Sequence, residues 1–149
     1  MRSEAGTARP RILLVGGNPP VAGMLSDYLL HDDRYEVESI ADCDDALAVL
    51  QRRWVDLVLV LSLHVPWGTL VSSYSSAWRI DLANAILFLK HMRTLQSPAP
   101  VILVSGSPLA GAQEEALANG AFAFVFKPFN LAELDRLVVL ALESRKGNR

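Results

Sequence analysis

The stretch Gly120-Ala-Phe-Ala-Phe-Val-Phe-Lys-Pro-Phe129 decides the fold of this chain. It begins at a glycine that ends a helical pattern, continues as a short apolar and aromatic run, and stops at Lys127-Pro128. A short apolar run without alternation, bounded by chain-breaking residues, is typical of a strand buried on both faces of a parallel sheet. We therefore predict a strand over residues 121–126.

The rest of the chain alternates similar apolar runs with segments of helical spacing. The strongest buried-strand pattern is Asp56–Leu63, whereas Tyr35–Ile40 alternates imperfectly, as an edge strand does. Asn130 is the predicted N-cap of the last helix. This alternation predicts a parallel sheet with helices on both faces. The predicted strands are 12–15, 35–40, 56–63, 101–105 and 121–126, and the predicted helices are 21–30, 44–53, 78–95, 110–119 and 130–142.

The bulk composition fits one compact domain. The chain has 149 residues, of which 51% are apolar and 20% charged, and its net charge of −2 comes without a basic run. Bulk attraction to nucleic acid is therefore not indicated. Cys43 is the only cysteine, which excludes an intramolecular disulfide and a cysteine metal cluster.

The ends of the chain are polar. We expect residues 1–10 to be a flexible leader, residues 11–143 to be the domain, and residues 144–149 to be a polar tail. No apolar run is long enough for a spanning helix, and Met1–Pro10 lacks the apolar centre of a secretory signal. The expected location is the cytoplasm, with neither membrane nor nucleic acid as partner.

The 120–129 stretch resembles the fifth-strand signature of response-regulator receiver domains, which runs glycine, alanine, two acids, an aromatic, two residues, lysine, proline and phenylalanine. The resemblance covers roughly residues 11–142 and includes Ser105-Gly106 after the fourth predicted strand. It implies an α/β, flavodoxin-like, doubly wound fold of three layers, with a five-stranded parallel sheet of order 2-1-3-4-5. It also implies a role in two-component signalling.

The acidic centre of that family is missing. Receivers carry an acid pair after the first strand, which holds Mg²⁺, and a phosphoryl-accepting aspartate after the third. The acid pair aligns with Gly16 and Gly17. The phosphoacceptor position aligns with Ser62 when counted back from Pro66, the alignment we favour, and with Leu61 when counted forward from Asp56. No metal site is expected unless another acid, such as Asp56 or Asp81, rebuilds it.

Other family positions are kept. The resemblance implies that Ser105 is the switch hydroxyl, Phe124 the aromatic rotamer switch and Lys127 the anion-sensing lysine. It also implies a cis bond before Pro128. Because the acids are missing while these positions remain, we expect a pseudo-receiver that is not an enzyme, needs no cofactor and signals through phosphorylation-independent protein–protein contact.

Aromatic residues mark two candidate contact surfaces. Trp67 and Trp78 lie in or beside the long loop over residues 64–76, where they either bind a partner or cover the vacated acid pocket. Phe122 stands where receivers usually have an acid, on the face that the family uses for partner and dimer contacts. We expect signalling proteins as partners and association, including a homodimer, through the face formed by segments 110–119, 121–126 and 130–142.

Two alternative functions remain open at this point. The weaker is an enzyme of flavodoxin-like topology, for which the sequence shows no nucleophile–base pair or acid pair. A sensor of a small anion or nucleotide would use the strand-end pocket, with Gly16, Gly17, Ser105 and Lys127 as the anion site.

Overall fold

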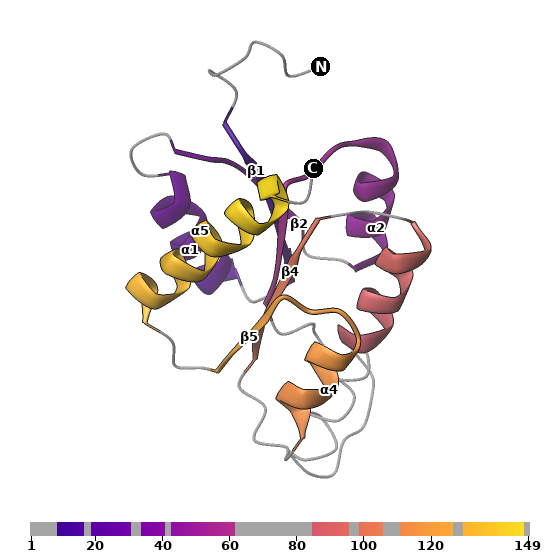
Figure 1. Ribbon diagram of the computed structural model, residues 1–149. Coiled ribbons are helices and arrows are strands. Elements are labelled where there is room, and N and C mark those ends of the chain that lie inside the picture. The colour runs from indigo at the N-terminus through magenta and orange to yellow at the C-terminus, as the bar shows by residue number, and fades with distance from the viewer. Residues whose placement is uncertain are drawn as a thin grey trace.

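The computed structural model describes residues 9–16, 19–30, 34–40, 43–61, 85–95, 99–105, 111–126 and 130–147. Strands and helices alternate along the chain (Figure 1). The strands are β1 (Arg11–Gly16), β2 (Glu36–Ile40), β3 (Leu57–Leu61), β4 (Val101–Ser105) and β5 (Ala123–Phe126). The helices are α1 (Pro19–Leu30), α2 (Cys43–Arg52), α4 (Ala112–Ala118) and α5 (Leu131–Gly147), and residues 85–94 are also helical.

The five strands form one parallel sheet of order β2-β1-β3-β4-β5, which confirms the predicted topology. β3 lies at the centre, and all five of its residues are buried. Its unalternated apolar sequence follows from this position, because both faces of a central parallel strand are covered. β2, the strand predicted to lie at an edge, is an edge strand and is only partly buried.

Helices cover both faces of the sheet, so the molecule has three layers (Figure 1). Alternate residues of the strands enter two separate cores. On the α1 and α5 side, Leu14 and Leu59 pack with Leu134 of α5. On the other side, Leu13 and Val60 pack with residues of α2, of the helical segment 85–94 and of α4.

The final helix is longer than predicted. We expected it to end at Leu142 before a polar tail, but α5 continues to Gly147. Its N-cap is confirmed, because the Asn130 side-chain oxygen accepts hydrogen bonds from the backbone N–H groups of Ala132, at 2.7 Å, and Glu133, at 3.2 Å. None of the described helices is long and apolar enough to cross a membrane.

Candidate functional site

The carboxyl ends of the strands meet along one edge of the sheet. Gly16 of β1 pairs in register with Leu61 of β3, Leu61 pairs with Val104 of β4, and Val104 pairs with Val125 of β5. In an open α/β sheet of this topology, working sites lie at this edge, where the strand order reverses. Of the sequence-predicted site residues, Gly16 and Ser105 end strands at this edge.

At this edge, β1 and β3 end in residues without a carboxylate. Gly16 has a φ of 79°, in the left-handed region that favours glycine. Leu61 is fully buried in the core on the α1 and α5 side. A leucine in that environment offers neither a ligand for Mg²⁺ nor an acceptor for a phosphoryl group. Within the described residues, no group of three or more His, Cys, Asp or Glu side chains could hold a metal ion.

Two of the predicted switch residues fall within the described residues. Ser105 is the last residue of β4 and pairs in register with Phe126 of β5. Phe124 is 8% exposed and packs in the core on the side of α2 and α4. The remaining predicted site residues lie outside the described residues: Gly17, Ser62, Trp67, Trp78, Asp81, Lys127 and Pro128.

Asp56 does not rebuild a metal site at this edge. It precedes β3, at the amino end of the strand, and Leu61 marks the carboxyl end five residues later. At about 3.3 Å per residue, the two ends are roughly 16 Å apart. Asp56 instead accepts hydrogen bonds from the Arg11 backbone N–H, at 2.8 Å, and from the Trp54 indole N–H, at 3.0 Å. Its role is to join the start of β1 to the turn before β3.

The comparisons with known proteins agree with the fold. No protein-family model matches the chain. The nitrogen assimilation regulatory protein NtrX of Azorhizobium caulinodans is 28% identical over 141 residues, which are 93% of this chain and 27% of NtrX. The signal receiver domain of an HD domain-containing protein from Pseudomonas fluorescens Pf-5 matches with a TM-score of 0.74 and 26% identity, covering 96% of this chain and 93% of that one.

These likenesses support a response-regulator receiver domain. A further structure of the same fold is the beryllofluoride-activated NtrC4 receiver domain dimer, with a TM-score of 0.71 and 17% identity over 91% of this receiver and 98% of that chain. The present receiver spans about a quarter of the length of NtrX.

The sequence did not predict the contacts that Arg34 makes with Asp135 and Tyr35. The Arg34 guanidinium donates to Asp135 of α5 at 2.9 Å, and its Cζ atom lies 5.0 Å from the centre of the Tyr35 ring. The hydrogen bond to Asp135 raises the pKa of Arg34 above its ordinary value, and burial raises the pKa of Tyr35. Arg34 and Asp135 are 101 residues apart, so no local pattern could reveal the pair.

Proposed function

We propose that this receiver domain signals through protein–protein contact without control by aspartyl phosphorylation. The observation that carries the proposal is the absence of a carboxylate at the paired carboxyl ends of β1 and β3, Gly16 and Leu61. Burial of Leu61 in the core favours Ser62 as the phosphoacceptor equivalent, and a serine does not form an acyl phosphate. Gly17, the other acid-pair position, also has no side chain.

Loss of the acids removes the chemistry but not the framework. In receivers that are phosphorylated, the metal ion needs clustered carboxylate oxygens, because Mg²⁺ is a hard cation. Here the described core residues remain an ordinary receiver core, with β3 buried on both faces. The fold therefore still offers a surface on which partners can bind. Ser105 and Phe124 remain the residues whose side chains would move in a conformational change.

The experiment that tests this proposal is an NMR titration of the receiver with Mg²⁺, followed by beryllofluoride, a mimic of the acyl phosphate. We expect no saturable shift at the backbone amides of Gly16, Leu61 and Ser105. An acid-bearing receiver run in parallel should respond to both additions. A saturable shift at these amides of the present chain would overturn the proposal and show that another acid has rebuilt the site.

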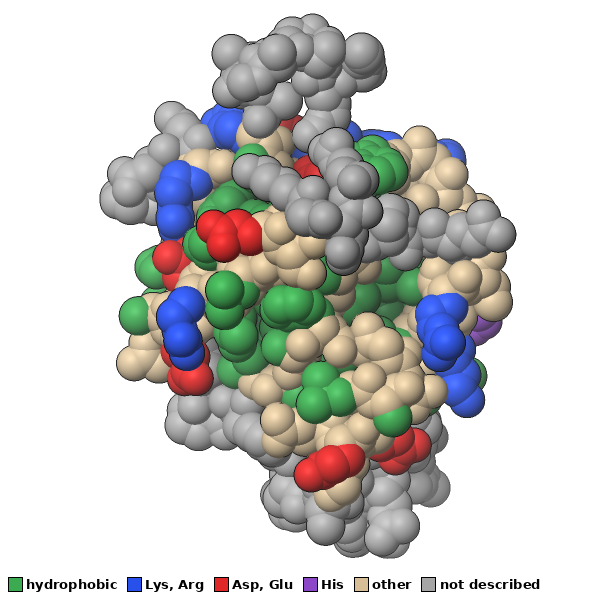
Figure 2. Space-filling view, in the orientation of Figure 1, with side chains coloured by type: hydrophobic (Ala, Val, Ile, Leu, Met, Phe, Trp, Pro, Cys, Tyr) green, Lys and Arg blue, Asp and Glu red, His purple; other side chains and the backbone are tan. Residues whose placement is uncertain are grey.

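The contact surface that we propose is the face formed by α4, the start of β5 and α5. Four large apolar side chains of these elements are exposed: Leu117 of α4 at 42%, Phe122 at 37%, and Val139 and Leu140 of α5 at 36% and 44%. Apolar side chains gather in the middle of the view in which these elements face the reader (Figure 2). Exposed apolar clusters often mark interaction sites. The NtrC4 receiver, a structural neighbour, forms a dimer, which supports a second copy as one partner.

Phe122→Asp tests this surface. We expect the substitution to shift the receiver from dimer to monomer, or to abolish partner capture, in sedimentation and pull-down measurements, because a charge in a desolvated interface is costly. Met24→Asp is the matched control, since Met24 is 46% exposed but belongs to α1. Unchanged association of the Phe122→Asp protein would count against this face while leaving the phosphorylation-independence proposal intact.

A further inference from the structure

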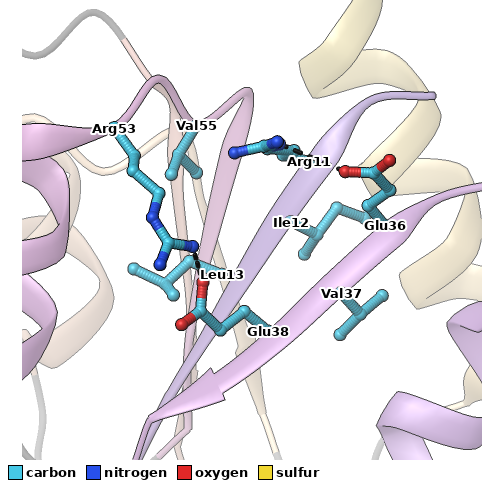
Figure 3. Close-up of a pocket in the computed structure, with 8 residues that line it drawn as sticks. All are labelled: Arg11, Ile12, Leu13, Glu36, Val37, Glu38, Arg53 and Val55. Atoms are coloured by element: carbon cyan, nitrogen blue, oxygen red, sulfur yellow. Dashed lines mark hydrogen bonds and ion pairs between the residues drawn. The ribbon is translucent and has the colours of Figure 1, made fainter. Parts of the chain in front are cut away.

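A groove opens at the opposite end of the sheet from the acid-centre positions. It has a volume of about 200 Å³ and lies over the amino ends of β1 and β2, next to the end of α2 (Figure 3). Leu13 and Val55, both buried core residues, form an apolar floor. Small-molecule sites usually measure about 300–1,000 Å³, so this amino-end groove suits a side chain of a partner better than a cofactor.

Two arginines stand over this floor, each oriented by a glutamate of β2 (Figure 3). Arg11 Nε donates to Glu36 Oε1 at 3.1 Å, and Arg53 Nη1 donates to Glu38 Oε1 at 2.8 Å. A guanidinium has five N–H donors, so each group keeps further donors beyond its glutamate bond. The ion pairs are about half exposed, and such pairs contribute at most about 1 kcal/mol. They orient the arginines without exhausting their binding capacity.

An exposed tryptophan is fixed next to Arg11. The Trp54 side chain is large and apolar, yet the residue is 47% exposed. Its indole N–H donates to Asp56, whose other oxygen accepts the backbone N–H of Arg11. This shared carboxylate holds the indole in a defined position beside the start of β1. Tryptophan and arginine are the residues most enriched at the energetic centres of protein interfaces.

Among the described residues, the exposed charge beside this groove is positive. Four arginines there stand against the exposed Glu36 and Glu38, which leaves an excess of two positive charges among these residues. The third carboxylate, Asp56, is 8% exposed and already accepts two hydrogen bonds. The whole chain has a net charge of −2. The arginines are Arg9, Arg11, Arg52 and Arg53.

We propose that the amino-end groove docks an acidic segment of a partner protein. A carboxylate of the segment accepts hydrogen bonds from Arg11 and Arg53, and an adjacent apolar side chain rests on Leu13 and Val55, beside Trp54. Charge complementarity selects the acidic segment, and the apolar floor selects its neighbouring side chain. The site does not involve the strand ends that receivers phosphorylate, so it stands apart from the function proposed above.

The test is an NMR titration of the full receiver with the peptide acetyl-Glu-Glu-Leu-Glu-Glu-amide. We expect saturable shifts of the Trp54 indole N–H and of the backbone amides of Arg11 and Val55. Arg53→Gln should weaken binding about tenfold, the usual scale for losing a charge-assisted hydrogen bond. Arg93→Gln, an exposed arginine in the helical segment 85–94, is the control and should leave the affinity unchanged.

Two further measurements test whether binding at the groove depends on negative charge in the ligand. Glu38→Gln should bind the acidic peptide equally well or more tightly, because it frees Arg53 from its ion pair. The peptide acetyl-Lys-Lys-Leu-Lys-Lys-amide should not bind. The proposal is overturned if the basic peptide binds at the groove, if Glu38→Gln abolishes acidic-peptide binding, or if the acidic peptide leaves the Trp54 signal unmoved.

Discussion

At the scale of single residues, Asp56 shows how a buried carboxylate is made tolerable. It accepts one hydrogen bond from the backbone of Arg11 and one from the Trp54 side chain. Buried acids are tolerated when such bonds replace their hydration. The residue therefore serves the structure, and it also fixes the indole beside the amino-end groove.

Asp56→Ala should destabilise the receiver by about 2 kcal/mol, because two donors lose their common acceptor. The free energy of unfolding in urea measures this loss. Asp45→Ala, at an exposed position in α2, should change stability by no more than about 0.5 kcal/mol. Equal losses in the two variants would argue against the joining role of Asp56.

Two glycines should respond with opposite sign to alanine. Gly120 has a φ of 108°, and its nearest neighbour for an added Cβ is Arg93 Cδ at 3.9 Å, so only the backbone opposes a side chain. Gly120→Ala should cost about 1 kcal/mol or more. Gly23 lies in α1 with open space around it, so Gly23→Ala should add about 0.5–1 kcal/mol. Urea unfolding of both variants checks the contrast.

At the scale of elements, the sequence predicts what depends on local periodicity. The apolar run of β3 and the turn at Gly120 are visible in the sequence, and alternating strands and helices indicate a parallel sheet. The sheet order came from the resemblance to receiver domains. The extension of α5 to Gly147 was not predicted. Its last turns present polar residues such as Glu143 and Ser144, and an exposed helix end needs no apolar stripe to mark it.

The start of α5 offers a test of local capping. Asn130→Ala removes the acceptor for the N–H groups of Ala132 and Glu133, and should cost about 1 kcal/mol. Asn130→Asp should retain most of the stability, because a carboxylate caps equally well and is favoured at a helix N-terminus. Thermal unfolding of the three proteins distinguishes the cap from a general effect of substitution at this position.

The candidate site was predictable only in part. The strand ends that bear Gly16, Leu61 and Ser105 followed from topology, since parallel strands end at one edge. The groove at the other end was not predictable, because it depends on pairs between separate segments, Arg11 with Glu36 and Arg53 with Glu38. The first pair depends on the register of β1 and β2, which places Arg11 opposite Glu36. The second joins β2 to the residue that follows α2.

At the scale of the whole molecule, the free energy of unfolding should decrease at alkaline pH. Burial raises the pKa of Tyr35 above its ordinary value near 10. A raised pKa means that the folded state holds the phenol proton more tightly than the unfolded state. This contribution is complete below the unfolded pKa and is lost as the pH rises through the folded value.

Urea unfolding between pH 8 and pH 11 measures this dependence. The free energy of unfolding should decrease above about pH 10, and Tyr35→Phe should make the decrease shallower. Tyr28→Phe should change the slope less, because Tyr28 is the smallest of the causes that raise the pKa of Tyr35. A slope that is the same in the Tyr35→Phe protein would assign the alkaline loss to other groups.

The left-handed backbone at Gly16 bears on whether a carboxylate could stand at this strand end. An L side chain in that conformation costs about 1–2 kcal/mol, although aspartate is one of the residues that tolerate it. The free energy of unfolding of a natural domain is only about 5–15 kcal/mol. An aspartate introduced at position 16 would destabilise the fold through backbone strain unless a bound metal ion offset that cost. Under the function proposed above, Gly16→Asp alone should therefore lower the free energy of unfolding, because backbone strain opposes the new side chain.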